Sequence, residues 1–246
     1  MNNDLLIIAG AWFIGAFING LTGMGGALIS MPLISLFVSS KDVILISLIT
    51  GTMVGTLTMV FYWRYIDIKE VLGFWLPAIP GIAVGVWTLK VVDISTLELL
   101  LCVLIVVHIV VQLIQDWLGT CMAPRAVMKY VCGFVAGFFG GAIGINGPIM
   151  AIYASLMCME KNKARGFFAS ATATSYINIA IVAASGLLTE QVLSSCTWVA
   201  PSAVIGFLCA CPLAKRIKQE TFHIALLILL GFAALSLFVR VIPNLI

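Results

Sequence analysis

The sequence predicts an all-α membrane protein of about eight transmembrane helices, built as two homologous four-span repeats whose helices are broken by glycine. Three observations support this fold class. Of the 246 residues, 62% are hydrophobic and only 9% are charged, whereas roughly a quarter of the residues of soluble domains are charged. The apolar residues form long continuous runs, and two of these runs carry clustered glycine and proline at matching positions.

Eight apolar runs are long enough to cross a hydrocarbon core of about 30 Å, which takes roughly 20 helical residues. They lack the alternating pattern of outer-membrane barrel strands, so each is predicted to be helical. Charged residues gather between the runs, and only Glu98 lies within one. The runs cover residues 5–38, 43–63, 71–89, 94–114, 130–159, 166–189, 191–214 and 221–239.

The basic residues between these runs give a first prediction of orientation. With eight simple spans, one side of the membrane holds Lys41, Lys90, Lys161, Lys163, Arg165, Lys215, Arg216 and Lys218. The other side holds Arg64, Lys69, Arg125, Lys129 and Arg240. Cytoplasmic loops carry the excess of Lys and Arg, so this small excess places both termini outside.

An internal repeat appears when the sequence is shifted by 121 residues. Gly20, Gly23 and Gly26 then fall on Gly141, Gly144 and Gly147, and Pro80 falls on Pro201. Such duplication is typical of transporters whose substrate site lies between the halves near the middle of the membrane. We therefore predict repeats at 1–118 and 126–246. Four crossings in each repeat would make the copies parallel, and a glycine stretch that folds back would invert them.

Glycine and proline interrupt the first span of each repeat, in "TGMGGALISMP" and "GAIGINGPIMA". Inside a helix glycine costs about 1 kcal/mol and proline about 3 kcal/mol relative to alanine. In lipid, the freed backbone groups are tolerated only where they are buried in protein or line a cavity. Pro148 directly follows Gly147 and suits the first turn of a new helix. The stretches therefore predict broken helices at the substrate site.

Close helix packing is the alternative explanation of the same glycines. Small residues three and four positions apart allow helix backbones to touch. That spacing occurs in the series Gly20, Gly23 and Gly26 and in the series Gly137, Gly141 and Gly144. Packing does not require the adjacent pair Gly25 and Gly26.

No Asp, Glu, Lys or Arg lies deep in a span, so neither a cation nor an anion would meet an opposite side-chain charge. A half-helix that begins inside the membrane offers free N–H groups and about half a positive charge. Two such ends favour a small anion. The predicted site combines the glycine stretches with polar residues of the following spans: Thr22, Gly23, Gly25, Gly26, Gly144, Asn146, Gly147, Thr50, Thr52, Thr172, Thr174, Ser175 and Asn178. Alternatively, the hydroxyl groups bond back to their own helices.

His108 lies within the span 94–114 and is a candidate proton relay. Alternatively, it is a neutral side chain bonded to a neighbouring helix. The chain shows no metal-ligand set, so neither a metal nor a cofactor is expected. The expected partners are a small anion and the lipid bilayer, with a homodimer left open, and nothing indicates binding to nucleic acid.

The stretches "NGLTGMGGALISMPLI" and "AGFFGGAIGINGPIMAIYASL" resemble the TauE/SafE family of membrane transporters, also called the sulfite exporter or TSUP family. The resemblance covers nearly the whole chain. It implies passage of small sulfur-containing or related anions, such as sulfite, sulfonates or sulfoacetate, across a bacterial-type cytoplasmic membrane. The chain departs from the family pattern at Ala27 and Asn146, where the family commonly has glycine.

Two other functions use part of the same evidence. An anion channel would share the fold but would need a continuous wet path and no obligatory conformational change. An intramembrane enzyme would need a nucleophile with a base, or a metal set, within the spans. No such constellation is visible in the sequence, so we predict that the protein is not an enzyme.

Overall fold

The computed structural model describes residues 2–35, 37–38, 41–118 and 126–213. Within these ranges the secondary structure is helical and contains no strand, which confirms the all-α prediction. Six of the described helices are long and apolar enough to cross a membrane. The predicted span 221–239 lies outside the described residues, so the number of eight spans is not confirmed.

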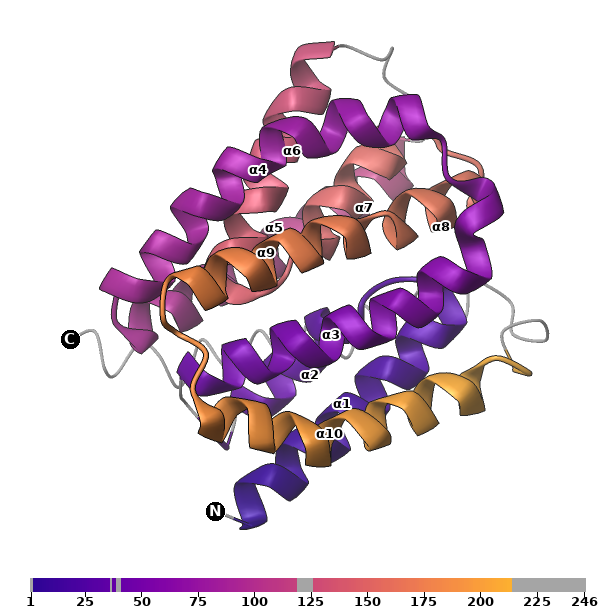
Figure 1. Cartoon of the computed structure of the whole chain (residues 1–246). Coiled ribbons are helices and arrows are strands. Elements are labelled where there is room, and N and C mark those ends of the chain that lie inside the picture. Colours follow the sequence, from indigo (N-terminus) through magenta and orange to yellow (C-terminus); the bar gives the residue numbers. More distant parts are fainter. Residues whose placement is uncertain (1, 36, 39–40, 119–125, 214–246) are drawn as a thin grey trace.

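Figure 1 shows the arrangement of the described helices. In chain order they are α1 (Asn2–Thr22), α2 (Gly26–Ser35), α3 (Lys41–Tyr62), the 3₁₀ helix η1 (Trp63–Tyr65), α4 (Ile68–Val91), α5 (Ile94–Leu118), α6 (Ala126–Ile143), α7 (Gly147–Leu156), α8 (Lys161–Ala169), α9 (Ala171–Ala184) and α10 (Glu190–Ala210). The starts of α2 and α7 are offset by the same 121 residues as the glycine pairs of the sequence.

The predicted span 5–38 is not one helix but a hairpin of α1 and α2. The hydroxyl of Ser30 donates to the carbonyl of Ala11 at 3.0 Å, and Gly26 lies against the carbonyl of Gly15. Because residues further along α2 contact residues earlier in α1, the two helices are antiparallel. Apolarity alone does not distinguish a hairpin from one long helix, because both bury the same residues in lipid.

The arginine Arg165 marks one end of the helix bundle, which we call the Arg165 end. Its Nη2 donates to the carbonyl of Leu21, at the end of α1, at 3.2 Å. Nearby, Lys163 lies 3.4 Å from the carboxylate of Asp67, which caps the start of α4. The hydrogen bond from the N–H of Glu70 lowers the pKa of Asp67 below its ordinary value. Asp67 is therefore charged and stabilises the positive end of the α4 dipole.

Glu70 connects three helices at the same end. Lys129, near the start of α6, lies 2.6 Å from its Oε2, and the hydroxyl of Tyr153 in α7 donates to its Oε1. Because α6 begins at this end and α7 returns to it, the predicted span 130–159 is also a hairpin. The chain therefore reverses direction at both glycine stretches, which we call the first and the second hairpin tip.

The opposite end of the bundle, which we call the Lys90 end, gathers other connections. Lys41 donates to the carbonyl of Lys90 at 3.3 Å, and Lys90 donates to the carbonyl of Ser185 at 3.4 Å. The start of α3 and the ends of α4 and α9 therefore lie together. Since α1 ends at the Arg165 end and α6 begins there, the first helices of the two predicted repeats run in opposite directions.

The hairpins change the grouping of the basic residues. Eight simple spans group Lys41 and Lys90 with Lys161, Lys163 and Arg165, and the structure shows that this grouping is wrong because each hairpin reverses the chain once more. At the Arg165 end lie Arg64, Lys69, Lys129, Lys161, Lys163 and Arg165, whereas Lys41 and Lys90 lie at the other end.

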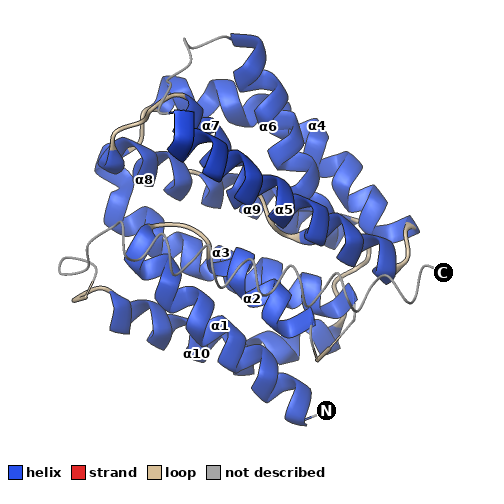
Figure 2. Ribbon diagram, turned by 180° about the vertical axis from the view of Figure 1, so that it is seen from behind, coloured by secondary structure: helices blue, strands red, loops and turns tan. Residues whose placement is uncertain are grey.

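Helices from one half of the sequence pack against helices from the other half. The helix α10 lies along α1, where Ser202 donates to the carbonyl of Ala9 at 2.9 Å, and α4 lies along α6. Figures 1 and 2 accordingly show α10 beside α1 and α4 beside α6. The division into repeats at 1–118 and 126–246 stays a prediction about the sequence, and it does not coincide with the groups of helices that pack together.

Glycine allows α4 and α6 to touch along their length. A Cβ atom at Gly133, Gly137 or Gly141 of α6 would overlap a backbone carbonyl oxygen of α4. These positions are four residues apart and lie on one face of the helix. The packing explanation is therefore confirmed for this glycine series, whereas Gly144 lies beyond the end of α6.

We expect Gly137→Ala to destabilise the fold, because its Cβ would overlap the carbonyl oxygen of Ala78. Overpacking of this kind costs about 1–3 kcal/mol. The matched control is Gly10→Ala in α1, where a Cβ meets nothing within 4 Å. Thermal unfolding of the purified protein in detergent should show a lower Tm for Gly137→Ala alone. Equal Tm values for both variants would contradict the close approach of α4 and α6.

Candidate functional site

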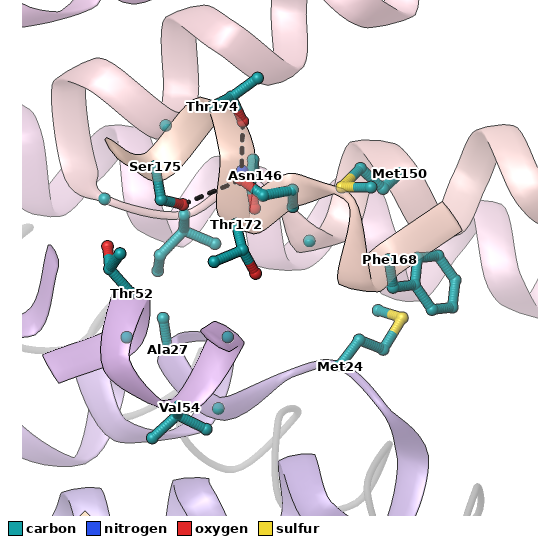
Figure 3. Close-up of a pocket in the computed structure, with 18 of the residues that line it drawn as sticks. Met24, Ala27, Thr52, Val54, Asn146, Met150, Phe168, Thr172, Thr174 and Ser175 are labelled. Carbon is teal, nitrogen blue, oxygen red and sulfur yellow. Dashed lines mark hydrogen bonds between the residues drawn. The ribbon is translucent and has the colours of Figure 1, made fainter. Parts of the chain in front are cut away.

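Both hairpin tips line one cavity of about 110 Å³. About 10–15 Å³ of such volume admits one water molecule, so the cavity has room for a small ion with several waters. Figure 3 shows Met24 and Ala27 of the first hairpin and Asn146 of the second around it, with Thr52 of α3 and Thr172 of α9. A Cβ at Gly147 would lie 3.9 Å from the methyl carbon of Met24, so the two tips approach each other closely.

The structure brings most of the predicted site residues to this cavity. Of the thirteen predicted binding residues, all except Thr22 and Thr50 are among those that line it. Thr50 is fully buried, and its hydroxyl has no hydrogen-bond partner within the described part of the chain. The lining comes from α1, α2, α3 and α4 and from α6, α7, α8 and α9 with the connections between them, so both sequence halves contribute.

Glycine is required where the first hairpin turns. Gly23 and Gly25 have φ of +87° and +97°, and Gly144 of the second hairpin has φ of +73°. Side chains other than glycine are strained in this region. Thr22 closes the turn, because its Oγ1 lies 2.6 Å from the carbonyl oxygen of Met24 and accepts from the Met24 N–H at 3.3 Å. The role of Thr22 seen here is therefore to shape the tip.

The starts of α2 and α7 lie at the cavity. The first bonds of the two short helices are made by the N–H groups of Ile29 and Met150, to the carbonyls of Gly25 and Asn146. The N–H groups before these have no partner inside the helix. Among the described lining residues none is charged, whereas a helix start carries about half a positive charge.

The hydroxyl groups around the cavity bond to their own helices. Thr52 donates to the carbonyl of Leu48 at 2.7 Å. Thr174 and Ser175 both donate to the carbonyl of Ala171, at 2.8 and 3.1 Å, as the dashed lines in Figure 3 mark. A hydroxyl has one proton, so these groups present lone pairs to the cavity. The alternative of bonding back to the helix is confirmed for these three, and donation to a substrate stays a prediction.

Two asparagines converge on the last turn of α6. The Nδ2 of Asn178 donates to the carbonyl of Gly140 at 2.7 Å, and a Cβ at Gly140 would lie 3.6 Å from the Cβ of Asn146. Asn178 is only 3% exposed. Its Oδ1 is buried and has no partner in the described part of the chain. Leaving a buried amide oxygen without a hydrogen-bond donor destabilises the folded protein. We therefore expect a bound group to donate to this oxygen.

Further lining residues were not predicted from the sequence. Asn19 is buried and donates from Nδ2 to the hydroxyl of Thr58 at 3.1 Å. Trp12 donates from Nε1 to the hydroxyl of Ser47 at 3.1 Å. Asn19 directly precedes the first glycine of the motif, and this polar position in an apolar run was the available signal. Trp12 gave none, because aromatic residues are common in membrane helices.

Arg165 was predicted as a loop charge, yet it lies against the first hairpin tip. A Cβ at Gly23 would lie 3.1 Å from its Cγ, and its guanidinium lies 5.4 Å from the ring centre of Tyr62. The equivalent place on the second tip is Gly144, and a Cβ there would lie 3.7 Å from the carbonyl oxygen of Ile44. Arg165 and Ile44 differ by the same 121 positions as the two glycines. The two tips thus have corresponding neighbours of different charge.

His108 lies away from this arrangement. It is buried in α5 and is not among the residues that line the cavity. The proton-relay role stays a prediction.

The comparison with known families agrees with the resemblance in the sequence. The family described as "Sulfite exporter TauE/SafE" matches residues 7–237 of the chain. No curated protein and no solved structure matches it.

We expect Gly147→Val to abolish ligand binding without loss of the fold. Its Cβ meets only the Met24 methyl at 3.9 Å, an ordinary contact, and the branched side chain then enters the cavity. Anion uptake into proteoliposomes should fall at least about tenfold, equal to about 1.4 kcal/mol, while Tm stays near that of the parent. Gly10→Ala is the control. Uptake at the parent level, or loss of the folded protein, would reject the role of Gly147 at the site.

Arg165→Gln should weaken the capture of anions, because it removes a positive charge beside the first tip. Partly exposed charges contribute about 0.2–1 kcal/mol, so the half-saturating concentration should rise by a factor of roughly 1.4 to 5. The effect should shrink at high salt, since the charge is screened. Lys163→Gln, at the same end of the bundle, is the matched control. Equal effects of the two variants would show that anion capture depends on the net charge of this end and not on the position of Arg165.

Proposed function

The chain belongs to the sulfite exporter TauE/SafE family, and from this membership we propose that it carries small anions of the sulfite or sulfonate kind through the cavity between its hairpin tips. The family implies a membrane transporter. The substrate class and the position of the site are the proposal. The bacterial-type cytoplasmic membrane, implied by the resemblance, is part of the same proposal.

One observation carries the proposal: two helix starts meet at a cavity whose described lining has no charged side chain. Each helix start contributes about half a positive charge, and the pair therefore offsets the charge of one small monoanion. A permanent cation at the centre of the membrane would cost at least about 2.5 kcal/mol. Backbone donors avoid that cost because they carry no net charge.

The opposed directions of α1 and α6 support a carrier rather than a channel. Inverted repeats with broken helices at the substrate site are typical of carriers that alternate between two open states. Here the first tip contacts α8 through Arg165, and the second contacts α3 through Ile44. Each tip therefore contacts a helix from the other half of the sequence. An anion channel remains the second candidate, and counter-flow distinguishes it.

The orientation follows from the basic residues of the described part. They gather at the Arg165 end, and cytoplasmic loops carry the excess of Lys and Arg. We therefore place the Arg165 end in the cytoplasm and the start of α1 outside. In this orientation the first tip faces the cytoplasmic side, and the second tip faces the opposite side.

A thermal-shift screen tests the substrate class. A ligand that binds only the native state at 100 times its Kd adds about 2.7 kcal/mol of stability. We expect sulfite or a small sulfonate to raise the Tm of the parent protein and to leave Gly147→Val unchanged. Choline and sodium salts of one inert anion serve as controls for ionic strength. A shift with cations and none with any anion would reject the proposal.

Counter-flow of labelled anion in proteoliposomes separates the two transport modes. A carrier preloaded with unlabelled anion accumulates the label transiently, because exchange outpaces net flow. A channel only equilibrates the label, and it passes anions far faster. We expect transient accumulation, and its absence with rapid equilibration would favour the channel.

A further inference from the structure

The amide of Asn178 has a fixed orientation. Its partner on α6 is the carbonyl oxygen of Gly140, at 2.7 Å, which accepts only from the nitrogen of the amide. The Nδ2 is therefore committed to α6, and Oδ1 is the free end of the side chain. That oxygen is buried without a partner in the described part of the chain.

In the described part of the chain no donor reaches this oxygen, although the amide of Asn146 also lies beside Gly140. Thr174, one turn earlier on α9, and Ser175 both give their single proton to the carbonyl of Ala171. The side chain of Asn178 is 97% buried and belongs to the lining of the cavity. The group that satisfies its oxygen is therefore expected inside the cavity.

The cavity thus has two chemically different sides. The backbone N–H groups at the starts of α2 and α7 offer donors, which suit the oxygens of an anion. The Asn178 oxygen and the outward lone pairs of Thr174 and Ser175 offer acceptors, which do not suit them. A ligand that fits both sides carries an anionic group and a hydrogen-bond donor.

We propose that Asn178 Oδ1 accepts a hydrogen bond from an O–H or N–H group of the substrate, so that the protein selects small monoanions with their own donor over aprotic anions of equal size. This inference rests on the proposed function. It narrows the substrate class to hydroxyl-, amino- or acid-proton-bearing anions. A site built to pair with a donor rejects the analogue that lacks it, because its buried acceptor is then left unpaired.

Two matched sulfonates test this selection. The probes are 2-hydroxyethanesulfonate and propane-1-sulfonate, which have the same charge and nearly the same size and differ by a hydroxyl in place of a methyl group. Titration calorimetry of the full-length protein in detergent should give a Kd at least roughly tenfold lower for the hydroxyl compound. Equal Kd values would overturn the inference, because a water molecule or another group would then satisfy Asn178. If neither sulfonate binds, the sulfonate part of the proposed function fails as well.

A variant pair assigns the selection to Asn178. We expect Asn178→Leu to reduce the ratio of the two Kd values to about one, whereas Asn19→Leu, the same change at another cavity asparagine, keeps the ratio of the parent. A ratio that persists in Asn178→Leu would overturn the assignment. If Asn178→Leu does not fold because its bond to Gly140 is lost, the comparison of the two probes on the parent still decides the proposal.

Discussion

The rest of the structure depends on one constraint, which is that backbone polar groups inside lipid need a partner. A helix that stops within the membrane breaks this rule unless its end meets protein, water or a ligand. The described part of the chain contains two helix starts of this kind, at Gly25 and Asn146, and both lie at one cavity. In the proposed function, the N–H groups at these helix starts are the donors that bind the anion.

Glycine serves two distinct purposes in this fold. In the α4–α6 contact it removes a side chain so that two backbones touch, as at Gly133 and Gly141. At the tips it permits a backbone conformation that other residues resist, as at Gly25, and leaves space beside it. The glycines of α6 allow the helices that form the cavity walls to pack closely, and the glycines of the hairpin tips leave space in the cavity. The two explanations of the glycine pattern therefore apply to different residues of the same chain.

The sequence predicted the helical class, and most of the residues it proposed for the site line the cavity, because clustered glycine and a polar residue such as Asn178 are unusual in lipid. It left open whether the spans 5–38 and 130–159 fold back, because hydropathy measures the transfer of residues into lipid and does not show the direction in which a helix runs. The grouping of the basic residues failed for the same reason. Arg165 was missed because its partners, Leu21 and Tyr62, are more than a hundred residues away.

The packing of α10 along α1 has a consequence for biosynthesis. The carbonyl of Ala9 accepts a hydrogen bond from the hydroxyl of Ser202. At about 5–20 residues per second, Ser202 is synthesised roughly 10 to 40 s after Ala9. Until then α1 rests in the bilayer with its later contact face against lipid or a chaperone. The contact between α1 and α10 therefore forms late in synthesis, after most of the other helices have been made.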